Sequence, residues 1–353
     1  MFDVEKYTEE IFRIESYKRF QELAYQAFKY QLENCKVFRE YHDIISPPAP
    51  KGAFEYTYLP IGLFKTNKIV SEDPGEVNID YKIFTSSATT SMVPSKHYVR
   101  DLSLYEKSFT KGFENFYGQV ENYNLLALLP SYLEREGSSL VYMADKLIAE
   151  VKRHGGEGGF YLYNHKELLE KLLEVCKPKA QKKTILLGVS FALLDFAAYV
   201  TSDECFAKEQ VKNKALKDLI IMETGGMKGR GKELSRKELH GILSSSFHTA
   251  NIHSEYGMAE LLSQCYCLGG ETFATPPWMS IVVRDLYNPL KISAEGKGAA
   301  NIIDLANVHS CCFIETDDIV EIKQKSGNAS GTIFKISGRV ANSDLRGCNM
   351  LLE

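Results

Sequence analysis

The chain has 353 residues, a formal net charge of −4, 44% hydrophobic residues and 25% charged residues. This composition is ordinary for a globular protein, and it lacks the basic field that nucleic-acid-binding proteins carry. No apolar run reaches the ~18 residues that a membrane span needs, because Gly188, Ser190 and Asp195 interrupt the longest candidate, residues 185–200. We therefore expect no nucleic-acid partner and no membrane span.

The N-terminal segment has the pattern of an amphipathic helix. Its apolar residues recur at helical spacing between charged ones: Phe20, Leu23, Ala24, Ala27, Phe28 and Leu32. Residues 46–50 read SPPAP, which cannot continue a helix. The first residues, MFDVEKYTEEIF, are partly acidic and contain no apolar core, so they do not predict a signal peptide. We expect a helical arm at residues 1–45 and a cytoplasmic protein.

The body of the chain, residues 46–337, alternates short apolar stretches with helix-like segments. Buried strands are expected at residues 184–189, 219–222, 279–284 and 301–305, and a helix at residues 192–199. Residues 319–323 and 332–336 alternate in hydrophobicity around a turn rich in Gly, Asn and Ser, which predicts a hairpin. This alternation favours an α/β fold, with residues 338–353 as a short C-terminal tail.

The eight cysteines do not have the spacing of a zinc ribbon or zinc finger. Because the sequence has no secretory signal, we expect free thiols. Seven of the eight are expected to pack as small hydrophobic side chains, and Cys348, near the C-terminus, is the exception.

Two segments suit a nucleotide. Residues 85–91 read TSSATTS, and their hydroxyl and backbone N–H groups suit a loop that wraps phosphates, although a solvated Ser/Thr loop has the same composition. Residues 223–231 read ETGGMKGRG and come directly after an apolar stretch. Glycines at a strand end let the backbone approach a nucleotide base. The alternative is a tight turn with basic residues in solvent.

Two further segments carry acidic residues. Residues 254–260 read SEYGMAE, where Glu260 suits Mg²⁺ beside phosphates and Tyr256 suits an adenine ring. A strand that enters a helix with an acid in its first turn explains this segment equally well. Asp318 precedes the predicted hairpin turn and Arg339 follows the hairpin; a carboxylate can accept ribose hydroxyls and an arginine can pair with phosphate. A surface acid and a surface arginine are the common alternatives.

In this order the four segments resemble the adenylate-forming superfamily of acyl-CoA synthetases, luciferases and peptide-synthetase adenylation domains. The resemblance is closer to the LuxE-type acyl-protein synthetases, the long-chain fatty acid–luciferin-component ligases. It runs from about Ser86 to the last residue, and its further segments are residues 129–135 (LPSYLER), 302–307 (IIDLAN) with His309 and Ser310, and 345–348 (LRGC). The implied fold is α/β, the large N-terminal domain of the superfamily, with mixed β-sheets flanked by helices.

The resemblance implies a role for each matching residue. The nucleotide would be bound by Ser86, Ser87, Thr89, Thr90, Gly225, Gly226, Tyr256, Asp318 and Arg339. In that set the hydroxyls would hold phosphates, the glycines and the tyrosine would border adenine, and the last two residues would bind ribose or phosphate. Glu260 would hold Mg²⁺, and Lys96 and Cys348 would be catalytic.

The implied reaction joins a carboxylic acid, expected to be a fatty acid, to a thiol through an acyl-adenylate, with ATP as substrate and Mg²⁺ as cofactor. In the LuxE branch a cysteine near the C-terminus accepts the acyl group, and Cys348 stands at the matching place. Because an acylated cysteine must hand on its cargo, we expect a protein partner: an acyl reductase, an acyltransferase or a carrier protein. Self-association of subunits stays open.

Three residues depart from the family pattern. Ala88 and Ser91 stand where the phosphate loop has glycines, and Ala259 replaces the threonine of a Tyr-Gly-Met-Thr-Glu motif. Two alternatives therefore stay open: an acyl- or aryl-CoA or acyl-carrier-protein ligase that acts with a partner, and a catalytically degenerate subunit that binds a nucleotide or an acyl group. We also expect this chain to lack the small C-terminal domain of most adenylate-forming enzymes, as the acyl-protein synthetases do.

Overall fold

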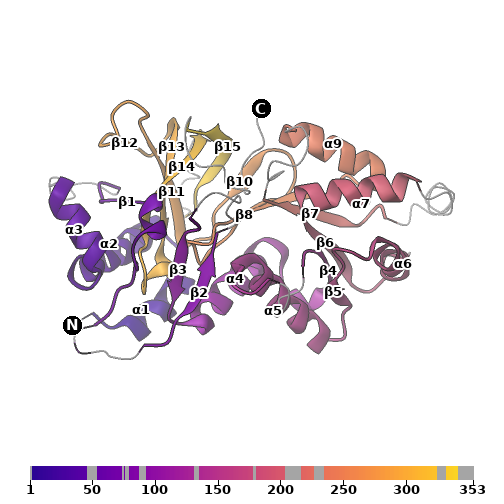
Figure 1. The fold of residues 1–353 in the computed structure, drawn as a ribbon, viewed down its shortest axis with the longest axis horizontal. Coiled ribbons are helices and arrows are strands. Elements are labelled where there is room, and N and C mark those ends of the chain that lie inside the picture. The colour runs from indigo at the N-terminus through magenta and orange to yellow at the C-terminus, as the bar shows by residue number, and fades with distance from the viewer. Residues whose placement is uncertain are drawn as a thin grey trace. The chain divides into compact units, whose positions relative to one another are not determined.

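The computed structural model describes residues 2–45, 54–73, 75, 79–86, 93–130, 135–177, 180–202, 216–225, 234–323 and 331–340. The chain forms two compact units, whose elements Figure 1 labels. The first unit comprises Met1–Gly112, Gly257–Cys265 and Phe273–Asp344, and the second comprises Phe113–Tyr256, Tyr266–Thr272 and Leu345–Glu353. The division at residues 45 and 337 that the sequence suggests stays a prediction.

Helices open the first unit, as predicted. They are α1 (Val4–Glu10), the 3-10 helix η1 (Ile11–Arg13), α2 (Tyr17–Asn34) and α3 (Lys36–Ile45). Ser16 caps α2 by accepting a hydrogen bond from the backbone N–H of Arg19. The predicted apolar stripe of α2 is buried except for the half-buried Leu32. The helices are anchored to the rest of this unit by polar contacts too, since Gln31 Nε2 donates to the carbonyls of Asn307 and Val308.

The first unit contains a mostly antiparallel sheet with the strand order β12-β11-β13-β14-β15-β10. Its strands are β10 (Thr272–Ala274), β11 (Met279–Arg284), β12 (Ile292–Ser293), β13 (Gly296–Asp304), β14 (Phe313–Ile322) and β15 (Ile333–Arg339). A short strand, β1 (Leu59–Pro60), pairs in parallel with the start of β14 and leads into the 3-10 helix η2 (Ile61–Lys65). Buried and half-buried residues alternate along β14 and β15, so the predicted hairpin is confirmed.

The first unit also contains a separate pair of short strands and a short 3-10 helix after β13. Strands β2 (Lys82–Thr85) and β3 (Lys96–Val99) form an antiparallel pair in which Thr85 lies opposite Lys96. After β13 the chain turns through the 3-10 helix η4 (Leu305–Asn307), capped by the side chain of Asp304. Helix α4 (Leu102–Tyr117) contributes residues to both units.

The second unit is built on a parallel sheet. Its strands β4 (Tyr123–Leu128), β5 (Gly158–Phe160), β6 (Lys183–Val189), β7 (Ile220–Thr224) and β8 (Ile252–Tyr256) have the order β8-β7-β6-β4-β5, with β9 (Cys265–Cys267) beside β8. The helices are η3 (Val120–Asn122), α5 (Ser139–Arg153), α6 (His165–Val175), α7 (Ser190–Ser202) and α9 (Arg236–Phe247). Strands β4, β6 and β7 are buried almost throughout, as expected for a sheet covered on both faces.

The strand order of the second unit places helices on both faces of its sheet. Across the sheet, the chain steps toward one edge from β4 to β5 and toward the opposite edge from β6 through β7 to β8. Because parallel crossovers are right-handed, α5 covers one face, and α7 and α9 cover the other. Helices α7 and α9 lie side by side (Figure 1). The carboxyl ends of β7 and β8, where ligands bind in sheets of this kind, carry the residues considered next.

Two other predictions concern the described residues. None of their helices is long and apolar enough to cross a membrane. The six cysteines among them are free thiols, and Cys176 is half-buried while the other five are buried.

Candidate functional site

In the first unit, Glu260 contacts the edge of the predicted phosphate loop. The Ser95 hydroxyl donates to Glu260 Oε1 at 2.5 Å and lies 2.9 Å from Ser86 Oγ. The backbone of Ser86 donates to the Ser95 carbonyl at 3.1 Å, and the backbone of Ser95 donates to Ser86 Oγ at 3.0 Å. Ser95 and Glu260 are buried. The structure therefore brings together two predicted site residues, Ser86 and Glu260, through a serine that the sequence interpretation passed over.

The main chain that carries Glu260 is held by two buried side chains. His97 Nδ1 lies 2.7 Å from the Ala259 carbonyl oxygen, and Asn307 Nδ2 donates to the Glu260 carbonyl at 2.8 Å. The second ring nitrogen, His97 Nε2, lies 3.0 Å from Asn307 Oδ1. Burial lowers the pKa of His97, against these hydrogen bonds and the nearby Glu260 carboxylate, which raise it. No helix begins in this segment, so the alternative in which Glu260 lies in a first helical turn is wrong.

Asp318 and Arg339 form a partly buried ion pair in the first unit. They lie opposite each other on β14 and β15, with Arg339 Nε 3.2 Å from Asp318 Oδ1. The side chain of Arg339 is 12% exposed and that of Asp318 is 4% exposed, so Asp318 is not a surface turn residue. Arg339 Nη2 also lies 3.5 Å from Asp317 Oδ2. The alternative of an isolated surface acid and a surface arginine is therefore wrong.

In the second unit, Gly225 and Tyr256 stand at the carboxyl ends of neighbouring strands. Gly225 directly follows β7 and has φ +70°, a conformation that favours glycine. Its carbonyl accepts a hydrogen bond from Ser190 Oγ at 3.1 Å. Tyr256 is the last residue of β8 and is buried. The prediction that the Gly-Gly segment begins at a strand end is confirmed.

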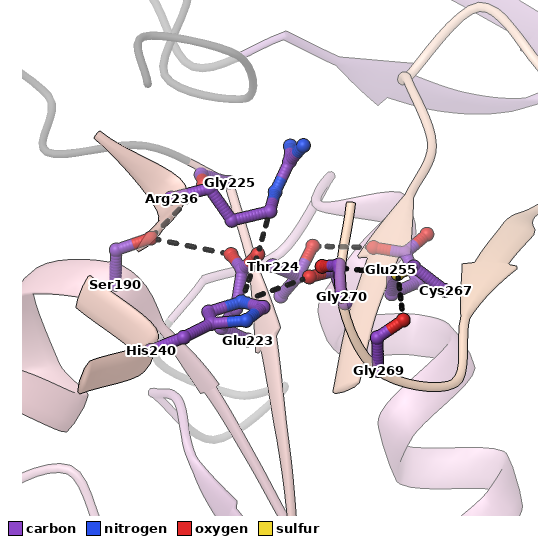
Figure 2. A network of polar contacts seen from close by, with 11 residues as sticks. Ser190, Glu223, Thr224, Gly225, Arg236, His240, Glu255, Cys267, Gly269 and Gly270 are labelled. Atoms are coloured by element: carbon purple, nitrogen blue, oxygen red, sulfur yellow. Dashed lines mark hydrogen bonds and ion pairs between the residues drawn. The ribbon is translucent and has the colours of Figure 1, made fainter. Parts of the chain in front are cut away.

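A buried carboxylate, Glu223, lies beside this turn on the face of the sheet that α7 and α9 cover (Figure 2). Arg236 Nε and His240 Nε2 each lie 3.6 Å from Glu223 Oε1, and Ser190 Oγ lies 3.5 Å from Glu223 Oε2. Because Ser190 contacts both the Glu223 carboxylate and the Gly225 carbonyl, this cluster ties the glycine turn to the start of α7.

A second buried acid, Glu255, faces the other side of the sheet. Thr224 lies opposite it in register and donates from its hydroxyl to Glu255 Oε2 (Figure 2). Burial raises the pKa of Glu255 to about 7; the Thr224 hydrogen bond lowers it and the charge of Glu223 raises it further. Two residues back on the same face, His253 Nδ1 lies 3.1 Å from the Tyr117 hydroxyl. Burial and the nearby His240 lower the pKa of His253 to about 4.

Several predicted residues are placed differently or lie elsewhere. Lys96 is exposed, because it alternates on β3 with the buried His97. The following residues discussed in the sequence analysis lie outside the described part of the chain: Ser87, Ala88, Thr89, Thr90, Ser91, Gly226 and Cys348. The sequence interpretation missed Ser95 and His97, whose spacing of two at the start of a strand could have indicated a shared face. It also passed over Asp304 and Asn307, which lie in the IIDLAN segment of the resemblance.

The donor set of the first unit fits Mg²⁺ only if phosphates supply most of the ligands. Among the described residues, no group of three or more His, Cys, Asp or Glu side chains could hold a metal ion. Glu260 supplies one carboxylate, with serine hydroxyls beside it. Mg²⁺ is commonly held by one or two carboxylates together with substrate phosphates, so this set is compatible with an ion that arrives with a nucleotide.

The fold has known counterparts. AtGH3.15 acyl acid amido synthetase in complex with 2,4-DB matches 98% of this chain and 73% of its own, with a TM-score of 0.51 and 10% sequence identity. Coronafacic acid ligase from Pectobacterium brasiliense matches 76% of this chain and 49% of its own, with a TM-score of 0.43 and 14% identity. Each unit combines a β-sheet with helices, and the similarity to AtGH3.15 confirms the predicted α/β fold class.

The sequence also has relatives. The family described as "Acyl-protein synthetase, LuxE" matches residues 138–353, more than half of the chain. The long-chain-fatty-acid–luciferin-component ligase of Vibrio harveyi is 27% identical over 155 residues, which are 42% of this chain and 41% of that protein. The match thus spans less than half the length of that relative. The chain belongs to the LuxE family of acyl-protein synthetases.

Proposed function

We propose that this protein uses ATP to activate a fatty carboxylic acid as an acyl-adenylate and then transfers the acyl group to a thiol, that of Cys348. The contact of Glu260 with Ser95, which in turn contacts Ser86, carries the proposal, because it links a carboxylate to a hydroxyl that the family resemblance assigns to phosphate binding. The fatty acid is suggested by the name of the Vibrio harveyi relative, a long-chain-fatty-acid–luciferin-component ligase.

In the first step, an oxygen of the substrate carboxylate attacks the α-phosphorus of ATP. A P–O bond to the leaving pyrophosphate breaks, and the mixed anhydride of the acid with AMP forms. This step needs no side-chain nucleophile, since positioning and electrostatic stabilisation are sufficient for reaction at phosphorus. Mg²⁺, when bound, neutralises charge on the phosphate oxygens. Glu260 would hold this ion, while the Ser86 hydroxyl and Lys96 would donate to phosphate oxygens.

The nucleoside is bound by two further sets of residues. Asp318 accepts the ribose hydroxyls, and Arg339, whose Nε lies 3.2 Å from Asp318 Oδ1, orients this carboxylate. Gly225 and Tyr256 border the adenine, since both stand at carboxyl ends of parallel strands. Gly225 also lacks a side chain that would keep the base away.

In the second step, the thiolate of Cys348 attacks the acyl carbonyl carbon and AMP leaves with the electrons of the C–O bond. Arg346, two residues before Cys348 in the sequence, favours the thiolate by its charge. The resulting thioester is a carrier state that passes its acyl group to a partner protein: a reductase, an acyltransferase or a carrier.

ATP–pyrophosphate exchange with a panel of fatty, aryl and short-chain acids tests the proposal. We expect exchange that depends on a fatty acid, together with thioester labelling of the protein by radioactive acid. The Cys348→Ser variant should retain exchange and lose stable labelling. Labelling of that variant at the wild-type level would refute the role of Cys348. Exchange without labelling, but with thioester on CoA or a carrier protein, would favour a ligase that acts with a partner. No exchange with any acid would favour a degenerate binding subunit.

A further inference from the structure

The segment that follows β8 and carries Glu260 has no regular secondary structure. Residues 257–264 lie between β8 and β9, and one backbone hydrogen bond within them joins the N–H of Leu261 to the carbonyl of Met258 at 3.2 Å. All its residues except Gly257, Met258 and Ala259 are buried. Buried backbone groups need partners, so the conformation of this segment depends on the side chains that supply them.

Three side chains from distant parts of the chain supply these partners within the first unit. His97 contacts the carbonyl before Glu260, and Asn307 donates to the carbonyl of Glu260 itself. Asp304 accepts hydrogen bonds from the backbone N–H groups of Leu262 at 2.9 Å and Ser263 at 3.0 Å. Glu260 is therefore held from both sides along the chain.

His97 and Asn307 contact each other as well as the segment that carries Glu260. Because Asn307 Nδ2 must face the Glu260 carbonyl, its Oδ1 faces His97 Nε2, at 3.0 Å. Both ring nitrogens of His97 thus face oxygen atoms: Nδ1 faces the Ala259 carbonyl and Nε2 faces Asn307 Oδ1. Displacing either residue removes a partner of the other, so the two are expected to act together.

Asp304 adds a buried carboxylate to the same segment. It is fully buried, and besides the two backbone contacts it accepts from Ser263 Oγ at 2.6 Å and from the backbone of Ala306 at 3.2 Å. Burial raises the pKa of Asp304, and these hydrogen bonds lower it. A buried carboxylate is costly unless it is well hydrogen-bonded, and three of these four bonds come from Leu262 and Ser263, which follow Glu260.

The geometry points to His97, Asn307 and Asp304 as positioning residues that set where the Glu260 carboxylate lies and hence how tightly Mg²⁺ with a nucleotide is held. This inference rests on the proposed role of Glu260. Groups that orient a metal ligand typically change metal affinity by about 10- to 100-fold when they are replaced. The three residues need not touch the ion or the substrate to have this effect.

Binding of Mn²⁺ in the presence of a non-hydrolysable ATP analogue, followed by EPR spectroscopy, tests the inference without turnover. We expect His97→Leu and Asn307→Leu to weaken Mn²⁺ binding by about tenfold or more. His97→Asn keeps an amide donor near the position of Nδ1, so it should restore most of the affinity. The Mg²⁺ concentration that gives half-maximal ATP–pyrophosphate exchange should rise in parallel, while the KM of the fatty acid stays unchanged.

Thr275→Val is the matched control. Thr275 is buried in the same unit, where its hydroxyl donates to the Met279 carbonyl and accepts from the backbone of Thr332, both at 2.8 Å. This variant should lose thermal stability and keep wild-type Mn²⁺ affinity. The inference is overturned if folded His97→Leu and Asn307→Leu bind Mn²⁺ like the wild type, or if Thr275→Val weakens binding equally.

Glu260→Gln, measured beside these variants, distinguishes failure of the proposed metal role of Glu260 from failure of the positioning role of His97 and Asn307. If Glu260→Gln weakens Mn²⁺ binding and the His97 and Asn307 variants do not, the positioning role alone is wrong. If Glu260→Gln binds Mn²⁺ like the wild type, the proposed metal role of Glu260 is wrong and the positioning inference falls with it.

Discussion

Replacing Glu255 by glutamine should make the protein more stable at neutral and alkaline pH. The glutamine keeps the shape of the side chain and an oxygen that can accept the Thr224 hydrogen bond. It removes a carboxyl group that is 7% exposed and whose pKa burial raises from 4.5 to about 7. The substitution therefore isolates the cost of ionising an acid at the buried end of β8.

The size and sign of the effect follow from the two pKa values. Between pH 4.5 and about 7, the unfolded chain releases the proton of Glu255 while the folded protein keeps it. Because the folded state then binds more protons than the unfolded state, the free energy of unfolding of the wild type falls as pH rises through this window. At ~1.4 kcal/mol per pH unit, the difference between the two pKa values corresponds to about 3 kcal/mol.

Urea unfolding at pH 5, 6, 7 and 8 measures this difference. The stability of Glu255→Gln relative to the wild type should rise by about 2–3 kcal/mol from pH 5 to pH 8, because part of the full difference is already present at pH 5. Glu170→Gln, at an exposed position of α6 in the same unit, is the control and should show a difference that does not change with pH. A constant difference for Glu255→Gln across the series would refute the argument that Glu255 is protonated in the folded protein near neutral pH.

Three other substitutions have defined outcomes. Glu260→Gln should lower fatty-acid-dependent ATP–pyrophosphate exchange by about 100-fold with little loss of folded protein, because it removes the carboxylate that would hold Mg²⁺ beside the phosphates; exchange near the wild-type level would contradict this. Arg339→Met leaves the buried Asp318 carboxylate without its 3.2 Å cation, so it should cost about 3 kcal/mol in urea unfolding and raise the KM of ATP; an unchanged KM would argue against ribose binding there. Gly225→Ala should cost about 1–2 kcal/mol in thermal unfolding, because φ at this position is +70°; a neutral effect would mean that the turn adopts another conformation.

Local patterns predicted the elements well. The alternation of apolar and polar residues in 319–323 and 332–336 predicted β14 and β15, because one face of each strand is buried and the period of a strand is two. The helical spacing from Phe20 to Phe28 predicted α2 for the corresponding reason at a period of 3.6. In both cases the signal lies within a few neighbouring residues.

The strand order of the second unit could not be predicted in this way. Strands β4, β6 and β7 are mostly apolar and nearly fully buried, so their sequences do not distinguish a central from a neighbouring position. The order β8-β7-β6-β4-β5 depends on which faces the intervening helices cover, which is a property of the packed unit.

Local sequence patterns could not predict the contacts around Glu260, because these contacts join residues that are far apart in the sequence. Ser95 lies 165 residues before Glu260 in the chain, and His97 lies 210 residues before Asn307. The family resemblance selected the exposed Lys96, whereas the structure buries the residues on either side of it. The family resemblance placed Glu260, and the residues that hold it emerged only from the folded arrangement.

The fate of an isotopic label in the acid tests the proposed activation most directly. The protein is incubated with ATP, Mg²⁺ and a fatty acid whose carboxyl group carries ¹⁸O, and the nucleotide product is examined by mass spectrometry. Attack of the carboxylate on the α-phosphorus, followed by transfer to the thiol, predicts AMP that contains one ¹⁸O atom. Formation of ADP, with ¹⁸O in inorganic phosphate, would indicate an acyl-phosphate route and would contradict the acyl-adenylate.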